Sequence, residues 1–324
     1  MEMIKIKAKK FILIILVVIC MVFTSCSTNK QDKQKKQNNL ESYNISTNFN
    51  LLNNGKSVTS VNIEDYTVEL TLQIIFNSNV PFTLELGLID NFNQRRFEIK
   101  EGDNYLEDDI FKLKLPETDE EFQESNIIIR VDKLKNNYHD LIFFIKDVTK
   151  IQSNSIRGYD FLRLNINSTS ERGAEINYNT EVSFASAEEE NVFLELNPNV
   201  KKTSSNIDCK LQFNIDKIYE GERFIKEYEK HLNQEIDFVV MVLEDNKLLK
   251  INNLNQYAWS KSVIGKNGNI HFSATSNTTH KNDFVIILVP YPLLDLIESE
   301  RYQLLAYNNI CYYHYKFNES VELF

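Results

Sequence analysis

Apolar and polar residues alternate one by one along several short runs of this sequence. The run from Val68 to Phe76 places an apolar residue at every second position, and the run from Ile207 to Ile215 does the same. Side chains along a β-strand point to opposite faces in turn, so both runs predict strands with one buried face. The runs Leu141 to Ile145, Phe238 to Leu243 and Phe284 to Val289 are apolar throughout and predict strands covered on both faces.

Clusters of Asn, Asp, Gly and Ser separate these runs, as turns separate short strands. Only the segment from Gly221 to Gln234 reads as helical, because Phe224, Tyr228 and Leu232 recur every fourth residue. Many strands without alternating helices favour antiparallel β-sandwiches of immunoglobulin-like type over a parallel sheet. The fold class is therefore predicted to be all-β, although the Cys, Trp and Cys signature of true immunoglobulin domains is missing.

The second half of the chain repeats short motifs of the first half in the same order. These matches predict an internal duplication, with one sandwich repeat at residues 45–186 and another at residues 187–324. The helical segment would then be an insert in the second repeat, either closing an open sheet edge or taking part in recognition. The matched motifs are Leu72-Gln73 with Leu211-Gln212, Asp90-Asn91 with Asp245-Asn246, Asp140 with Asp283, and Tyr159 and Asn165 with Tyr302 and Asn308.

The N-terminus has the layout of an export signal. Four lysines lie within the first ten residues, and an apolar run of 13 residues extends from Phe11 to Phe23 before the sequence turns polar. A helix that crosses about 30 Å of hydrocarbon needs about 20 apolar residues. Residues 1–25 are therefore predicted to be a signal peptide rather than a permanent transmembrane anchor.

Small residues and a cysteine follow the apolar run, as Thr24, Ser25 and Cys26. This segment resembles the lipobox of bacterial lipoproteins, although Phe23 stands where that family usually has Leu. The resemblance covers residues 1–26 only. It implies that acyl chains such as palmitate on Cys26 hold the mature protein on the outer face of the cell membrane. The alternative is an ordinary signal peptide with a cysteine that has no such role.

The charges divide the mature chain into a basic tether, residues 26–44, and an acidic body. Between Ser27 and Leu40 there are four lysines and one aspartate, whereas residues 41–324 hold 28 basic and 44 acidic side chains. An anionic membrane surface attracts the tether and repels the body. Clustered positive charge, which nucleic acid requires, is absent from the body, so no nucleic-acid partner is expected. The bias towards Asn, Lys and Ile suggests an AT-rich genome and a Gram-positive cell.

Three cysteines remain after cleavage, namely Cys26, Cys209 and Cys311. The disulfide framework of small secreted domains is therefore not expected. Cys209 and Cys311 alternate in phase with apolar neighbours and are predicted to face the core. The sequence leaves open whether they are buried free thiols or a disulfide.

Catalytic and metal-binding motifs are missing from this sequence. Neither G-x-S-x-G nor H-E-x-x-H occurs, and no pair of the five histidines has metal-ligand spacing. The acidic stretch from Glu101 to Asp109 could offer oxygens to Ca²⁺, but it lacks the register of a known calcium loop and reads better as a solvated hairpin. We therefore expect no enzyme activity, no cofactor and no metal.

Aromatic residues of the second repeat are the best candidates for ligand binding. Tyr257 and Trp259 lie in a stretch rich in Asn, Ser and Lys, while Tyr312 and His314 share one face of a predicted strand. Flat rings beside polar side chains suit sugar stacking or a binding hot spot. The competing interpretation is that Trp259 fills the core.

These observations favour a membrane-anchored, extracytoplasmic lipoprotein that acts as a non-catalytic binding or envelope-scaffold module with a protein or glycan partner. A glycan or small-ligand receptor that uses the aromatic residues of the second repeat is one alternative. A hydrolase without recognisable motifs is the other.

Overall fold

Every regular element that the computed structural model describes is a β-strand, which confirms the all-β prediction. Residues Tyr43–Phe324 belong to one compact unit. The predicted helix at residues 221–234 lies outside the described residues and stays a prediction. Within the described part of the chain, no helix has the length and apolar character needed to cross a bilayer. The described residues are 45–63, 65–118, 122–134, 138–149, 158–168, 182–184, 197–202, 206–214, 235–263, 267–276, 284–290 and 310–315.

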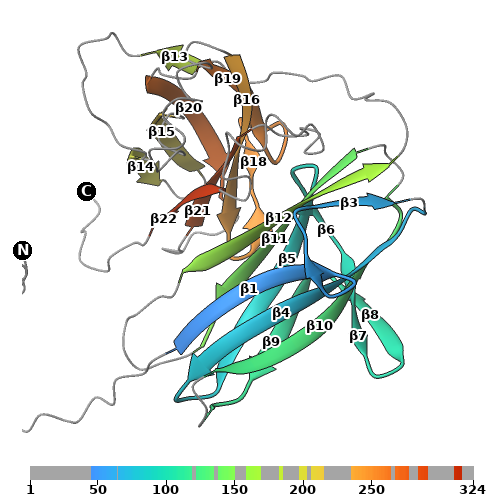
Figure 1. Ribbon diagram of the computed structural model, residues 1–324. Coiled ribbons are helices and arrows are strands. Elements are labelled where there is room, and N and C mark those ends of the chain that lie inside the picture. The colour runs from blue at the N-terminus through green and yellow to red at the C-terminus, as the bar shows by residue number, and fades with distance from the viewer. Residues whose placement is uncertain are drawn as a thin grey trace, which may run out of the picture. The chain divides into compact units, whose positions relative to one another are not determined.

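Two sheets form the first sandwich (Figure 1). Sheet A contains, in spatial order, β2 (Lys56–Ser57), β1 (Ile45–Asn53), β4 (Val68–Ser78), β10 (Gln123–Val131), β7 (Phe97–Glu101) and β8 (Asn104–Asp108). Sheet B contains β3 (Ser60–Ile63), β12 (Tyr159–Ser168), β11 (Tyr138–Asp147), β5 (Phe82–Asp90) and β6 (Asn93–Arg95). A further strand, β9 (Ile110–Leu115), also pairs with β5.

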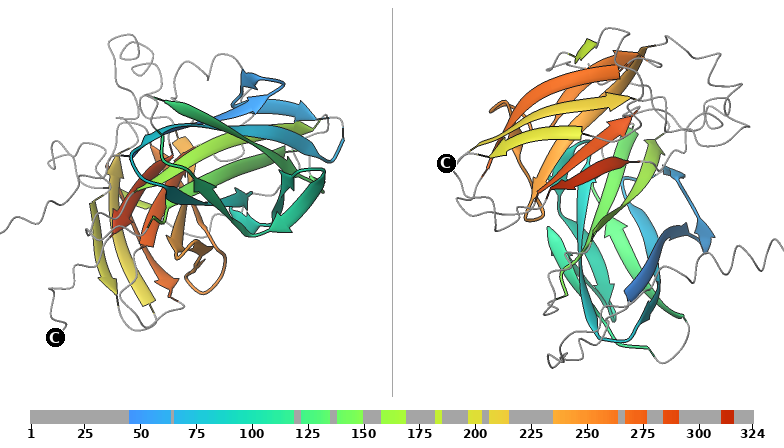
Figure 2. Two further views of the ribbon diagram at one scale, coloured as in Figure 1. Left: turned by 90° about the horizontal axis from the view of Figure 1, so that it is seen from below. Right: turned by 90° about the vertical axis from the view of Figure 1, so that its left-hand side faces the viewer.

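The alternation predicted for residues 68–76 appears directly in β4. Its apolar side chains face the core between the sheets, and Leu72 and Ile74 are fully buried. The intervening residues Thr71, Gln73 and Ile75 are only partly buried and face outwards. Sheets A and B lie face to face around this core (Figure 2). The prediction of a strand with one buried face is confirmed.

The N-terminal strand region changes sheets, a feature of immunoglobulin-like sandwiches. β1 pairs antiparallel with β4 in sheet A, and after a turn at Asn54 and Gly55 the chain reaches β3, which pairs in parallel with β12 in sheet B. Both turn residues have positive φ, 50° and 74°, a conformation that glycine and asparagine adopt more readily than other residues. This turn begins the crossover that ties the two sheets together.

The second sandwich is also built from two sheets. Sheet C contains β13 (Val182–Phe184), β20 (Asn267–Thr275), β15 (Asn206–Asn214) and β14 (Asn197–Lys202), with β18 (Lys250–Ile251) paired to β20. Sheet D contains β17 (Lys247–Leu248), β16 (Glu235–Glu244), β21 (Phe284–Pro290) and β22 (Cys311–Tyr315), with β19 (Ala258–Val263) paired to β16. β13 precedes the predicted start of the second repeat at residue 187 and already pairs within sheet C.

The two sandwiches share one topology, which confirms the predicted duplication. The order β1-β4-β10-β7 in sheet A corresponds to β14-β15-β20-β18 in sheet C. In sheet B, the order β12-β11-β5 corresponds to β22-β21-β16 in sheet D. The last strand of each set pairs with two more strands: β5 with β6 and β9, and β16 with β17 and β19. Each sandwich is thus one copy of the same β unit.

The equivalent turns correct details of the sequence alignment. The β5–β6 turn at Asn91 and Phe92 and the β16–β17 turn at Asp245 and Asn246 all have positive φ. Superposing these turns makes Asp90 equivalent to Glu244, one residue away from the predicted match. The match of Tyr159 with Tyr302 was wrong, because β22 is the strand that corresponds to β12. Short strands resemble one another, so pairing partners define equivalence better than motifs do.

Candidate functional site

A second hydrophobic core joins sheet B of the first sandwich to sheet D of the second. The first sandwich contributes Ile142 and Phe144 of β11, whose neighbours Leu141 and Phe143 face the first core. Strands β11 and β16 are therefore covered on both faces, as predicted, and one cover is the other sandwich. We call this second core the seam; its buried members are Ile89, Phe92, Ile142, Phe144, Tyr159, Val239, Met241, Leu243, Leu248, Trp259, Val285, Ile287, Val289 and Ile310.

Two of the four predicted ligand-binding residues lie in the seam on the side of β19. Trp259 is 5% exposed, and its ring meets Phe92 of the first sandwich edge-on at 5.5 Å between centroids. Tyr257 contacts the same Phe92 ring at 5.7 Å. Because Trp259 is buried against the chain's own first copy, its ring offers little surface to a ligand.

The other two predicted residues lie on β22 and also contact the first sandwich. His314 meets Tyr159 edge-on with ring centroids 5.6 Å apart, and Tyr312 packs against Phe161 at 5.0 Å. Tyr312 keeps 41% exposure at the margin of the seam. Partial burial, followed by the Asp160 carboxylate, raises the pKa of the Tyr312 hydroxyl, which therefore stays neutral at ordinary pH. All four predicted residues thus contact the first sandwich.

Amide side chains complete the seam with polar contacts. The Gln94 side chain donates to the Asn246 carbonyl at 2.9 Å and accepts from the Leu248 backbone N–H at 3.3 Å. The Asn246 side chain donates to Glu85 and accepts from the Tyr159 hydroxyl at 3.2 Å. A buried polar group costs free energy unless it is hydrogen-bonded, so these bonds allow polar groups to lie at a core.

The seam has approximate two-fold symmetry. Gln94 is the second residue of β6 and Leu248 is the second residue of β17, so the two are equivalent positions in the two copies. They also contact each other through a hydrogen bond. Asn246 of the second copy binds Glu85 of the first copy. Phe92, the residue of the first copy that is equivalent to Asn246, contacts Trp259 of the second copy, which pairs with Val239 on the neighbouring strand. Val239 is in turn equivalent to Glu85. The same face of each copy is therefore used to bind the other copy.

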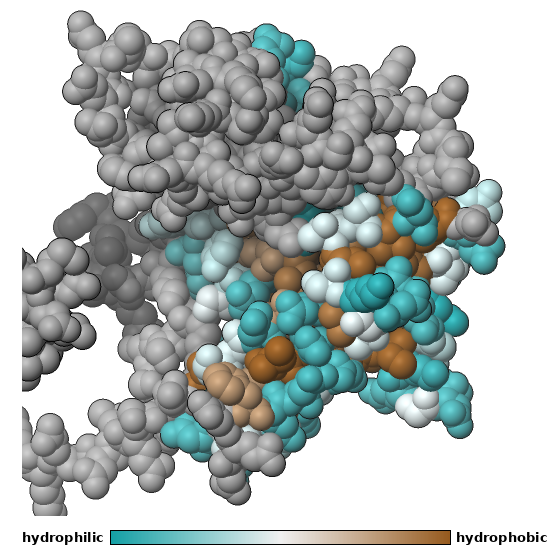
Figure 3. All heavy atoms as spheres, in the orientation of Figure 1, coloured by the Kyte–Doolittle hydropathy of each residue, from teal (hydrophilic) through white to brown (hydrophobic). Residues whose placement is uncertain are grey.

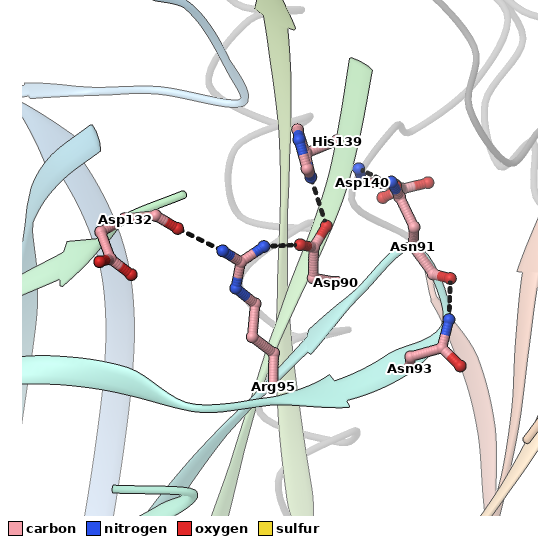
Figure 4. Close-up of polar contacts among 7 residues, drawn as sticks. All are labelled: Asp90, Asn91, Asn93, Arg95, Asp132, His139 and Asp140. Atoms are coloured by element: carbon pink, nitrogen blue, oxygen red, sulfur yellow. Dashed lines mark hydrogen bonds and ion pairs between the residues drawn. The ribbon is translucent and has the colours of Figure 1, made fainter. Parts of the chain in front are cut away.

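A polar cluster closes one end of the first core (Figure 4). Asp90 at the end of β5 accepts from Arg95, and its other oxygen lies 2.7 Å from His139 Nδ1. Arg95 also donates to the Asp132 carbonyl. A paired aspartate and histidine can serve catalysis when a nucleophile lies beyond the second ring nitrogen, but His139 Nε2 is buried with no hydrogen-bond partner among the described residues. The cluster therefore reads as a structural tie between β5, β6, β11 and the end of β10.

A buried ion pair lies on the seam side of sheet B. Arg163 of β12 binds the Asp140 carboxylate with two hydrogen bonds, from Nε at 2.8 Å and from Nη2 at 2.6 Å. Both side chains are almost fully buried. This bidentate geometry stabilises a buried ion pair, because the attraction between the two charges offsets the free energy of removing them from water.

Two further sequence predictions concern Cys209 and the acidic stretch. Cys209 is a buried free cysteine, and burial, followed by Asp208, raises the pKa of its thiol to about 12. The side chain of Cys311 lies outside the described residues. The stretch from Glu101 to Asp109 holds the turn and the second strand of the β7–β8 hairpin, in which Glu101 pairs with Asn104, as the hairpin interpretation predicted. No group of three or more potential metal ligands occurs in the part of the chain that the structure describes.

The outward face of sheet A was not among the candidate sites predicted from the sequence. In the view where β1, β4 and β10 lie in front, hydrophilic and hydrophobic patches are interspersed over the surface of the first sandwich (Figure 3). Asn50, Gln73 and Asn126 form one cross-strand row on this face. Alternation along residues 68–76 placed Gln73 outwards, but the pairing register that aligns it with Asn50 and Asn126 could not be obtained from one sequence.

No family model matches the sequence, and neither does any curated protein. Among solved structures, the E. coli chaperone DraB matches with 8% identity and a TM-score of 0.26, over 76% of this chain and 93% of that one. A PapD-like domain of human CEP192 matches with 9% identity and a TM-score of 0.23, over 46% of this chain and 98% of that one. Since the TM-scores are this low, the fold assignment depends on sheet topology.

Proposed function

We propose that this protein is an extracytoplasmic lipoprotein, anchored through Cys26, that acts as a non-catalytic binding or envelope-scaffold module. The proposed anchor rests on the lysine-rich start, the 13-residue apolar run and the lipobox-like residues before Cys26. The basic tether would hold the chain at an anionic leaflet, while the acidic body stands away from it.

The seam is the observation that carries the binding-module part of this proposal. A hydrophobic core between the sandwiches makes their relative position part of the fold rather than a matter of linker length. Two copies held in this way display their remaining faces in fixed geometry, which suits a scaffold. The aromatic residues that favoured a glycan receptor in the second repeat are engaged with the first repeat instead.

Interior charges support a non-catalytic role. Asp140 is bound by Arg163, Asp90 by Arg95 and His139, and the Glu244 carboxylate accepts the Ser276 hydroxyl at 2.9 Å. Catalytic acids and bases instead face a substrate site, where their protonation can change. These carboxylates serve the fold.

The Cys26→Ala variant tests the anchor. We expect this variant to appear in the medium or to accumulate unprocessed, because acyl chains on Cys26 would supply the membrane affinity. The measurement is the membrane-bound fraction together with the mass of the processed chain. Cys20→Ala is the matched control, since Cys20 lies within the predicted signal peptide and should be dispensable. Normal processing of Cys26→Ala with unchanged membrane retention would contradict the proposal.

A further inference from the structure

The outward side chains of the adjacent strands β1, β4 and β10 form a surface that we call the amide face. Its central row is Asn50, Gln73 and Asn126, which lie directly opposite one another on three adjacent strands. Neighbouring strands lie about 4.8 Å apart, so this row is about 10 Å long. The next row consists of Asn48, Ile75 and Glu124.

Hydrogen bonds orient the polar groups of the amide face. Asn50 Nδ2 donates to Gln73 Oε1 at 3.2 Å, and Asn126 Nδ2 donates to Glu124 Oε1 at 2.6 Å. Hydrogen bonds from Asn126 and then Gln73 lower the pKa of the Glu124 carboxyl, so it is ionised at neutral pH. A side-chain amide has two N–H donors and an oxygen with two lone pairs. These bonds therefore hold the amides in place while donors and acceptors still face solvent.

Charged residues gather at one end of the same sheet face and restrict its ligands. Arg130 pairs with Glu98, and its guanidinium lies 3.8 Å from the centre of the Tyr105 ring. This side holds four glutamates, two arginines and one lysine, because Arg96, next to the start of β7, pairs with Glu107: Glu69, Glu98, Glu107, Glu124, Arg96, Arg130 and Lys100. A face with this balance has no excess of positive charge with which to bind phosphate-rich or carboxylate-rich polymers.

The composition of the face also disfavours a protein partner. The centre of a protein–protein interface is enriched in aromatic and apolar side chains. Here the centre is a row of three amides. The apolar residues lie in the rows on either side of it, Ile75 in one and Leu52 and Ile128 in the other, and all three are partly buried. A ligand that fits must pair with donors and acceptors together and carry no negative charge, and hydroxyl groups meet both conditions.

We propose that the amide face binds a neutral oligosaccharide, whose hydroxyl groups bond to Asn50, Gln73, Asn126 and Glu124 while its C–H surfaces lie on Ile75 and Ile128. This inference rests on the proposed function of a surface binding module and names its ligand class. The site lies on the first sandwich, away from the aromatic residues that the sequence favoured.

The test measures oligosaccharide binding by the full chain, purified in a detergent without a sugar headgroup. The ligands are the hexamers of the cellulose, starch, xylan and chitin series, with heparin as a polyanion. We expect binding of at least one neutral hexamer and none of heparin. Gln73→Ala and Asn126→Ala should each weaken that binding about tenfold or more, because each removes hydrogen bonds to the ligand.

Asn62→Ala is the matched control, since Asn62 is an exposed amide on β3 of sheet B. It should leave affinity unchanged, and circular dichroism should show all three variants folded. Absence of binding to all four neutral hexamers, preference for heparin, or binding that survives both amide-face substitutions overturns the inference. A chain that binds no saccharide yet stays on the membrane through Cys26 refutes the ligand class but leaves the proposed anchor intact.

Discussion

Gly87 shows how one missing side chain shapes the seam. It lies directly opposite Phe144 in the β5–β11 pair, and a Cβ atom at this position would come within 2.1 Å of the Phe144 ring. The ring therefore lies across the backbone of β5, where it fills the seam. Any larger residue at position 87 must displace a fully buried phenylalanine.

Gly87→Ala is expected to destabilise the protein by about 1–3 kcal/mol, the usual cost of overpacking a tight core. Urea unfolding followed by circular dichroism measures this free energy. Gly158→Ala is the control, because the nearest atom to its Cβ would be the Tyr312 hydroxyl at 3.7 Å. Adding Phe144→Leu to Gly87→Ala should recover part of the lost free energy of unfolding, because the smaller side chain relieves the clash. If the two substitutions instead destabilise the protein additively, the close contact between them is contradicted.

The Asp140–Arg163 pair gives a second prediction for single residues. Arg163→Met should cost about 3–5 kcal/mol, because it takes the guanidinium away from a buried carboxylate. The double variant Asp140→Leu, Arg163→Met should be more stable than Arg163→Met alone, since no charge then remains buried. Chemical denaturation of both variants measures the difference. Equal or lower stability of the double variant would show that the charges are not isolated from water.

Strand faces could be predicted from the sequence better than strand partners. Alternation identified the buried face of β4, and the unbroken apolar run of β11 predicted a cover on each side. The same pattern does not identify which part of the chain packs on the second face, because the hydrophobic effect favours burial against any apolar surface. The seam and the amide face both depend on pairing register, which a single sequence does not specify.

Tryptophan provides a direct test of the seam at the level of elements. Trp259 is the only tryptophan in the chain, and it lies on β19, buried against the β5–β6 turn. Its fluorescence should therefore report whether the sandwiches stay together. We expect fluorescence and far-ultraviolet circular dichroism to change at the same denaturant concentration, because the shared core makes unfolding of the two sandwiches cooperative.

An earlier fluorescence transition would contradict this expectation, since it would show that the sandwiches part before their strands unfold. Trp259→Phe provides the baseline for the fluorescence signal. Its circular dichroism transition should move to lower denaturant, because a smaller ring leaves part of the seam unfilled.

At the scale of the whole molecule, the chain consists of two copies of one β unit that bind each other through the same face. This use of sheets B and D leaves the outward faces of sheets A and C as the broad sheet surfaces on which partners could bind. The amide face belongs to the first of these. If the proposed anchor at Cys26 holds, the basic tether and acidic body would present this surface at a distance from the membrane.

The approximate two-fold symmetry of the seam has a consequence for how its residues can change. In a homodimer, every substitution appears at both ends of the interface at once. Joining the copies in one chain removes this constraint, because each end then has its own codons. Phe92 and Asn246 occupy equivalent turn positions, yet one packs on Trp259 and the other binds Glu85. The turn of one copy thus makes an aromatic contact where the equivalent turn of the other makes polar ones, a difference that two identical chains could not achieve.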